Sequence, residues 1–169
     1  YDYPEADRDD DQWLYLPALR KIRRISASDR GDYFLGTDFS YEDIKKESKI
    51  AAEDYTFKRL GHEEVGAHQT ILLEATPRTD DIAKELGYSR VLLRVDPEIW
   101  MSRKSEMWDT SGNALKTLVS LDIREVGGIW TTHVLEATNH KTGHFSRFTF
   151  SDVNYADEVQ PDMFEQRIL

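Results

Sequence analysis

Apolar and polar residues alternate along most of this chain, and an alternation with a period of two predicts half-buried β-strands. Segment 115–125 shows the pattern best. One of its faces is largely apolar and carries Leu115, Thr117, Val119, Leu121 and Ile123. The opposite face is largely polar and carries Lys116, Ser120, Asp122 and Arg124. Leu118 is the apolar exception on the polar face, and the segment as a whole is the clearest predicted strand.

The same pattern predicts eight more strands, separated by residues that favour turns. These strands cover 12–16, 21–26, 55–60, 69–76, 89–95, 100–108, 129–138 and 144–152. The turn regions between them include 61–66, 96–98, 111–113, 127–128 and 139–143. The links between the last three strands are too short for a parallel crossover, so these strands form a meander. We therefore predict a mainly β (α+β) fold, built on one large, strongly curved antiparallel sheet.

Three short segments carry helix signals. Ser40 is a candidate N-cap for a helix over 41–49, with Asp43 three residues later in place of the usual Glu of a capping box. Segment 79–86 has acidic residues in its first turn and a glycine after its end. Segment 161–169 is a candidate terminal helix. The predicted helices are few and short beside the strands.

The composition agrees with a single domain over 1–169 and argues against several functions. A chain of 169 residues buries about 70% of its unfolded surface and needs no disulfide or metal ion to stabilise its fold. It has no cysteine, which excludes disulfides and thiolate chemistry. Its formal net charge of −10 argues against nucleic-acid binding. No apolar run approaches the roughly 18 residues of a membrane span, and no secretion signal is visible in the sequence.

The sequence predicts no catalytic residue, no bound metal and no cofactor. The histidines are scattered: His62, His68, His133, His140 and His144. The last two lie four residues apart, but Gly143 and the surrounding turn favour a solvated loop over a metal pair. No nucleophile elbow and no phosphate-binding glycine loop occur. We therefore expect a protein that is not an enzyme.

Two runs of charge each allow a functional and an ordinary interpretation. The acidic run 7–11 has the carboxylates that calcium prefers, but it lacks the spacing of a calcium loop, and a solvated loop before an edge strand is favoured. The basic run 20–24 offers a contact for lipid head groups or an acidic partner. Pairing with nearby carboxylates, including Asp29, Asp32 and Asp38, is the favoured interpretation.

Large apolar and aromatic side chains are numerous for a domain of this size. Segments 71–73 and 91–93 are apolar on both faces, which breaks the alternation expected of a sheet with one face in water. Such breaks indicate that a helix or a ligand covers both faces locally. The concave side of the curved sheet is then either filled by side chains or left as a cavity, and composition does not separate the two.

Several stretches share a pattern of residues with one bacterial family. They are Asp11–Ser26, Ser28–Arg30, Phe34–Asp43, Val95–Trp100 and Pro161–Leu169. The most specific parts are Trp13–Pro17 and Gly36–Tyr41. In these stretches the chain resembles outer-membrane lipoprotein-sorting proteins related to the lipid carriers LolA and LolB.

The resemblance implies an unclosed β-barrel with a few short helices as a lid over a hydrophobic hollow, here lacking the N-terminal portion of the domain. Motif residues would then build the barrel wall and corner: Trp13, Tyr15, Leu16 and Phe39. Asp38 and Ser40 would fix a turn and the start of a helix. The candidate lipid-binding residues of the hollow are Leu16, Phe34, Leu93, Trp100, Met101, Met107, Phe148 and Phe150.

The function implied by the resemblance is that of a periplasmic carrier. It would bind a lipid, or the acyl chains of lipoproteins, for outer-membrane lipoprotein sorting or lipid transport. Its partners would be the acyl chain and a membrane-bound transport protein. The alternative is a periplasmic protein-interaction or sensor module with a filled core, whose edge strands bind a partner. A small hydrolase is a third hypothesis, with the least support because no nucleophile constellation is visible.

Overall fold

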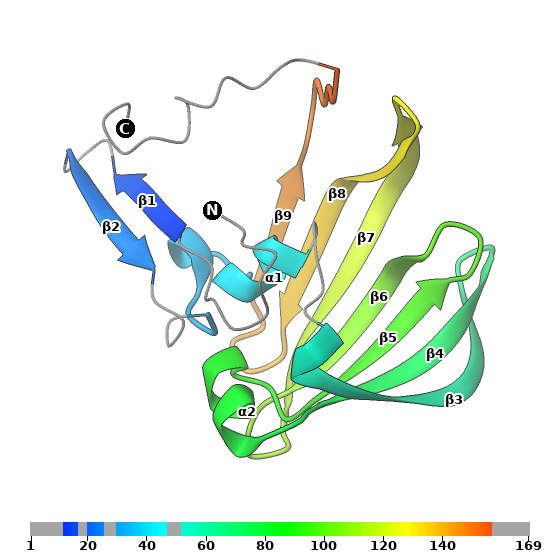
Figure 1. The fold of residues 1–169 in the computed structure, drawn as a ribbon, viewed down its shortest axis with the longest axis horizontal. Coiled ribbons are helices and arrows are strands. Elements are labelled where there is room, and N and C mark those ends of the chain that lie inside the picture. The colour runs from blue at the N-terminus through cyan, green and yellow to red at the C-terminus, as the bar shows by residue number, and fades with distance from the viewer. Residues whose placement is uncertain (1–11, 17–19, 26–29, 47–51, 157–169) are drawn as a thin grey trace.

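The structure is a computed structural model that describes residues 12–16, 20–25, 30–46 and 52–156. Its strands form two antiparallel sheets (Figure 1). The larger sheet has seven strands in sequential order, from β3 to β9, and does not close into a barrel. The mainly β fold with a curved, unclosed antiparallel sheet is thus confirmed. The acidic run 7–11 and the expected helix over 161–169 lie outside the described residues.

Each strand of the large sheet pairs with its neighbour in the sequence. The strands are β3 (Tyr55–Val65), β4 (His68–Pro77), β5 (Arg90–Asp96), β6 (Met101–Trp108), β7 (Ala114–Val126), β8 (Ile129–Asn139) and β9 (Phe145–Thr149). Because the strands are antiparallel, alternate connections lie at opposite ends. The β3–β4, β5–β6 and β7–β8 turns mark the open end of the sheet. The β4–β5, β6–β7 and β8–β9 connections mark the covered end.

The first two strands do not join the large sheet. β1 (Gln12–Leu16) and β2 (Lys21–Ile25) form a two-stranded ribbon, with Trp13 opposite Arg24. The ribbon stands apart from the curved sheet in Figure 1. The expectation that Trp13, Tyr15 and Leu16 belong to the wall of one single sheet is therefore corrected. Alternation predicts a strand but not its partner, because pairing depends on contacts distant in sequence.

Strands β3 and β4 are longer than the sequence predicted. The expected turn over 61–66 is mostly strand, and the chain reverses at Gly66 and Ala67. Gly61 lies at a register shift between the two strands with a φ of 152°. A glycine tolerates this backbone at a bulge without ending the strand. The expected turn at Gly61 was therefore wrong, because this glycine lies at a bulge within the strand.

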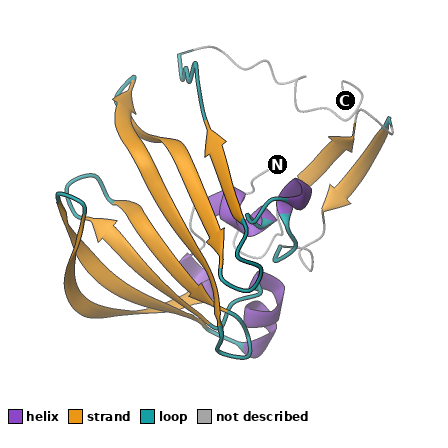
Figure 2. Cartoon of the chain, turned by 180° about the vertical axis from the view of Figure 1, so that it is seen from behind, coloured by secondary structure: helices purple, strands orange, loops and turns teal. Residues whose placement is uncertain are grey.

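Both described α-helices carry the caps that the sequence indicates. α1 (Tyr41–Lys46) begins with a reciprocal capping box, in which the Asp43 amide donates to Ser40 Oγ at 3.2 Å and the Ser40 amide donates to Asp43 Oδ2 at 2.7 Å. α2 (Asp80–Leu86) has Thr79 as N-cap and a left-handed Gly87 after its end. α2 lies at the covered end of the sheet, as the view from behind shows (Figure 2).

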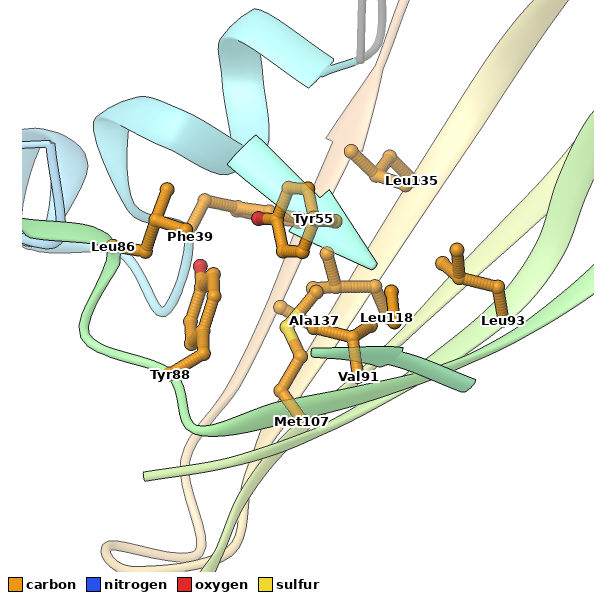
Figure 3. Packing of buried hydrophobic residues seen from close by; sticks show 11 residues of the cluster. Phe39, Tyr55, Leu86, Tyr88, Val91, Leu93, Met107, Leu118, Leu135 and Ala137 are labelled. Carbon is orange, nitrogen blue, oxygen red and sulfur yellow. The ribbon is translucent and has the colours of Figure 1, made fainter. Parts of the chain in front are cut away.

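The hydrophobic core lies on the concave face near the covered end, where segment 30–46 packs against the sheet (Figure 3). Phe39 is fully buried and stacks on Phe148 of β9, with ring centroids 4.6 Å apart. Burial of one such ring contributes about 2 kcal/mol. Asp38 holds the same segment in place, because Ser146 Oγ of β9 donates to its carboxylate at 2.6 Å. This contact engages Asp38 with β9, whereas the sequence had offered it as a partner of the basic run.

The buried face of β7 is the polar one. Lys116 is only 2% exposed and Leu118 is also buried, whereas Leu121, on the apolar face, is 41% exposed. The alternation was correct, but the assumption that its apolar side faces the core fails here. The reason is an acidic partner on another element: Lys116 pairs with Asp43 of α1.

Candidate functional site

A cavity of about 850 Å³ opens on the concave face of the large sheet. Its size lies within the range of about 300–1,000 Å³ typical of ligand sites. The lining comes from β3 to β8, from α1, from the turns of the open end and from Tyr155, which follows β9. The lining residues are Asp43, Tyr55, Phe57, Ala75, Val91, Leu93, Ile99, Trp100, Met101, Ser102, Ser105, Met107, Leu118, Ser120, Gly128, Ile129, Trp130, Thr132, Leu135 and Tyr155.

The inner part of the cavity is apolar because strand register brings small and large side chains together. Val91 of β5 pairs with Ala75 of β4 and with Met107 of β6. Further along, Leu93 lies beside Ser105, which pairs with Leu118 of β7. Side chains that are paired across strands point to the same face of a sheet. These rows therefore form one floor, which is apolar apart from Ser105.

The mouth of the cavity lies at the open end and is rimmed by aromatic side chains. Trp100, in the β5–β6 turn, is 75% exposed and has a φ of 57°. Trp130, beside the β7–β8 turn, is also exposed. Tyr155 completes the rim, with its hydroxyl 3.0 Å from Thr131 Oγ1. The cavity thus opens toward solvent between apolar surfaces.

Four of the predicted lipid-binding residues line this cavity: Leu93, Trp100, Met101 and Met107. The other four lie elsewhere in the described structure. Leu16 belongs to the separate ribbon, and Phe148 packs in the core against Phe39. Phe34 contacts Phe148 edge-on, and Phe150 lies beyond Phe148 on the way out of β9. Large size alone therefore did not distinguish core residues from cavity residues.

A buried ion pair closes the inner end of the cavity. Lys116 Nζ of β7 bonds the carboxylate of Asp43, which also accepts a hydrogen bond of 2.6 Å from the Tyr88 hydroxyl. Burial alone raises the pKa of Asp43, but the Lys116 charge and the hydrogen bonds outweigh burial and lower that pKa below its usual value. Burial and the neighbouring Asp43 charge raise the pKa of Tyr88 well above its usual value. The pair is thus charged and fully bonded.

A second charged cluster fastens α1 from its other side. Arg30 Nε donates to Glu42 at 2.8 Å, and Arg30 Nη2 donates to Asp54 at 2.8 Å. Asp54 belongs to η3 (Ala52–Asp54), the short 3₁₀ helix that leads directly into β3. Burial, followed by the Glu42 charge, raises the pKa of Tyr55 above its usual value. The lining at this end is therefore built from groups whose polar atoms are already engaged.

Sequence reasoning missed the hydroxyl groups of the lining. Ser102, Ser105 and Ser120 all face the cavity, together with Thr132. Single serines and threonines in strands give no distinctive signal, because they occur commonly on either face of a sheet. Only the register of the strands reveals that these residues meet.

Among the described residues, no group of three or more His, Asp or Glu side chains is placed to hold a metal ion. His140 lies in the β8–β9 turn with Nε2 at 2.8 Å from Thr117 Oγ1. None of the helices in the described ranges has the length and apolar character needed to cross a bilayer.

Comparisons with known proteins place this fold. The profile of a family described as "uncharacterized protein" matches residues 2–169. An outer membrane lipoprotein-sorting protein domain from Vibrio parahaemolyticus is 30% identical with a TM-score of 0.83, over 95% of this chain and 66% of that chain. A DUF1329 family protein from Desulfovibrio piger is 29% identical with a TM-score of 0.87, over 99% of this chain and 68% of that chain.

The chain belongs to the family whose model matches residues 2–169, and its fold is LolA-like. A LolA superfamily protein from Nitrosomonas europaea shares the fold, with a TM-score of 0.66 and 23% identity over 94% of this chain and 68% of that chain. No curated protein matches the sequence. The LolA-like chain spans about two thirds of the length of these solved structures, between 66% and 68%. The neighbours thus point to a lipoprotein-sorting or carrier fold.

Proposed function

We propose that this protein is a carrier that binds the acyl chains of lipids or lipoproteins in its cavity. The observation that carries the proposal is the cavity of about 850 Å³ with a largely apolar lining. Transfer of an acyl chain from water into such a cavity gains about 0.8 kcal/mol per methylene. The description of the Vibrio neighbour as an outer membrane lipoprotein-sorting domain supports the same role.

The proposed acyl contacts follow the cavity from its floor to its mouth. Leu93 and Met107 lie on the floor, whereas Met101 and Trp100 lie near the mouth. Methionine side chains are flexible and polarisable, so they adapt to chains of different shape. Binding would be reversible and would involve no covalent chemistry. In this proposal the carrier works in the periplasm and exchanges its cargo with a membrane-bound transport partner.

Two measurements test the carrier proposal. Native mass spectrometry of the purified protein is expected to show bound lipid, and the neutral dye Nile red is expected to fluoresce on entering the cavity. Ser120→Trp fills the cavity from its wall and should abolish dye uptake. Leu121→Trp is the matched control, because Leu121 is the next residue of β7, is half exposed and is outside the lining.

The results separate the carrier from the interaction module with a filled core. Equal dye uptake by Ser120→Trp and Leu121→Trp would place the dye elsewhere and overturn the carrier proposal. An absence of both dye uptake and bound lipid would also overturn it. The open cavity favours the carrier, since a packed interior is what the interaction module requires.

A further inference from the structure

Hydroxyl groups form the polar part of the cavity lining. Ser102 and Ser105 of β6, Ser120 of β7 and Thr132 of β8 together make what we call the hydroxyl belt. We propose that the hydroxyl belt binds the carbonyl of an uncharged acyl ester or amide. The cavity would then prefer esterified or amidated acyl chains to free fatty acid anions. This inference rests on the proposed carrier function and names its ligand class.

Breaks in strand alternation bring the belt together. Ser102 and Ser105 both line the cavity although they are three residues apart on β6. The β5–β6 pairing shifts register at this point, because Arg94 pairs with Lys104 and the next residue pairs with Ser102. The extra residue on β6 is a β-bulge. A β-bulge changes the face to which the neighbouring side chains point, and bulges are common beside binding sites.

A second irregularity occurs on β8. Leu135 and Thr132 both line the cavity, again three residues apart. Asp122, on the facing stretch of β7, has a φ of 47°, and its carbonyl oxygen lies 3.2 Å from Nδ1 of His133. A positive φ at a residue other than glycine is uncommon and marks a local distortion. Both distortions, on β6 and at the β7–β8 pair, thus lie beside belt residues.

The hydrogen-bond inventory of the belt leaves two donors unused. Ser102 donates to the Lys104 carbonyl at 3.2 Å, so Ser105 is the donor across the 3.1 Å contact between the two serine hydroxyls. Within the described ranges, the hydroxyls of Ser120 and Thr132 have no hydrogen-bond partner, and Thr132 is only 6% exposed. Rotation about χ1 exchanges the hydroxyl and methyl of threonine and turns the donor to the cavity. A carbonyl oxygen accepts a hydrogen bond from either hydroxyl. Thr132 lies three residues along β8 from Leu135, the partner of Ser120, or about 10 Å at about 3.3 Å per residue, so the two donors serve carbonyls at different depths of the cavity.

The described residues of the cavity lining offer no cation for an acidic ligand. The described lining contains one charged side chain, Asp43, and no Lys or Arg. The Asp43 carboxylate already receives Lys116, Tyr88 and the Ser40 amide. A carboxylate or phosphate inside the cavity would be buried without a partner, which is strongly unfavourable. An uncharged carbonyl fits both the free donors and the missing cation.

The position of the belt also orients the ligand. Val91 at the inner end and Val95 beside Ser102 are four residues apart on β5, or about 13 Å at about 3.3 Å per residue. An apolar tail would fill this inner stretch, with its carbonyl at the belt. The head group would then leave past Trp100 and Trp130 at the mouth.

Competition with Nile red tests the ligand class on the full chain. The competitors are methyl laurate, laurate at pH 8 and dodecane, which share one chain length and differ in the polar group. We expect the inhibition constant of methyl laurate to be about tenfold lower than that of laurate and about fivefold lower than that of dodecane. A fivefold ratio corresponds to the net free energy of about one hydrogen bond.

Two substitutions link this preference to the belt. Ser120→Ala with Thr132→Val should equalise methyl laurate and dodecane while leaving dodecane binding unchanged. Thr138→Val on β8 is the control, because this threonine is exposed and outside the lining. The melting temperature checks that both variants fold.

Retention of the ester preference in the double variant overturns this inference, as does laurate binding as tight as the ester. In those outcomes the carrier function stands, whereas failure of every competitor and of dye uptake overturns the carrier function itself.

Discussion

The two ends of the concave face show how one sheet can build both a core and a cavity. At the covered end, segment 30–46 fills the concave side, and Asp43 and Lys116 satisfy each other. At the open end no described element covers the face and the rim is aromatic. Within the described ranges the hydroxyls of Ser120 and Thr132 have no hydrogen-bond partner. The covering segment, and not the strands, decides whether the concave side is filled.

The turns at the two ends of the sheet also differ in the side chains that they carry. At the covered end, Lys141 of the β8–β9 turn bonds Asp109 of the β6–β7 connection at 2.5 Å. Ser89 Oγ, before β5, donates to the Asp109 carbonyl at 2.5 Å. The turn regions of the open end carry Trp100 and Trp130, both exposed. The open end has bonded turns too, because Arg103 Nε donates to Asp96 at 2.7 Å, so the two ends differ in the exposure of their aromatic side chains.

The largest expected effect comes from breaking the ion pair of the covered end. Lys116→Met keeps much of the side-chain volume but leaves Asp43 buried without its cation. We expect a loss of about 3–5 kcal/mol in the free energy of unfolding, measured by urea denaturation. Asp43→Asn combined with Lys116→Met removes both charges and should lose much less. Equal losses in the single and the double variant would show that the charge pair itself is unimportant.

A smaller effect is expected where segment 30–46 meets α2. A Cβ at Gly31 would lie 3.1 Å from the Glu85 carbonyl oxygen and 3.2 Å from the Leu86 carbonyl carbon. Both are backbone atoms, which cannot move without shifting the helix. Gly31→Ala should therefore lower the free energy of unfolding by about 1–3 kcal/mol. Gly66→Ala, in the β3–β4 turn, has open space around its Cβ and a φ of 60°, so it reports backbone strain without a clash.

The pH dependence of stability sharpens the comparison of the turns. Hydrogen bonds from Lys141 and from the Asn113 amide lower the pKa of Asp109 to about 2, from a usual value of 3.8. Because the folded pKa is depressed, the contribution is present above the usual pKa and is lost as pH falls from about 4 toward 2. In Asp109→Asn the melting temperature should therefore depend less on pH between about 4 and 2 than it does in the parent chain. An unchanged slope would contradict the assignment.

Local sequence signals predicted the elements but not their partners. Alternation located the strands, and Ser40, Thr79 and Gly87 marked helix ends, because caps and periodicity act within a few residues. The burial of Lys116 could not be foreseen, since its partner Asp43 is 73 residues away in sequence. Local signals also could not predict that β1 and β2 pair only with each other, because strand pairing depends on tertiary contacts.

The cavity was predicted only in part for a related reason. Leu93 and Met107 lie on strands that the sequence located, and the β5–β6 register brings them to the cavity. Phe148 has an equally apolar side chain but meets Phe39, which a sequence pattern cannot show. The hydroxyl belt depends on a register shift beside Ser102 and on the distorted backbone at Asp122, opposite β8, and no residue type signals such features.

The smallest effect on stability is expected at the mouth, where the effect on binding is large. Trp100 has a φ of 57° and is 75% exposed, so its side chain adds little to the core. Trp100→Gly relieves a left-handed backbone that costs a residue with a side chain about 1–2 kcal/mol, and stability should stay level or rise slightly. The rim also loses a large apolar surface, so Nile red should bind several-fold more weakly.

Leu35→Gly is the matched control, because Leu35 also has a positive φ of 51° but lies outside the cavity lining. Equal dye binding in both variants would mean that the aromatic rim has no part in holding a ligand.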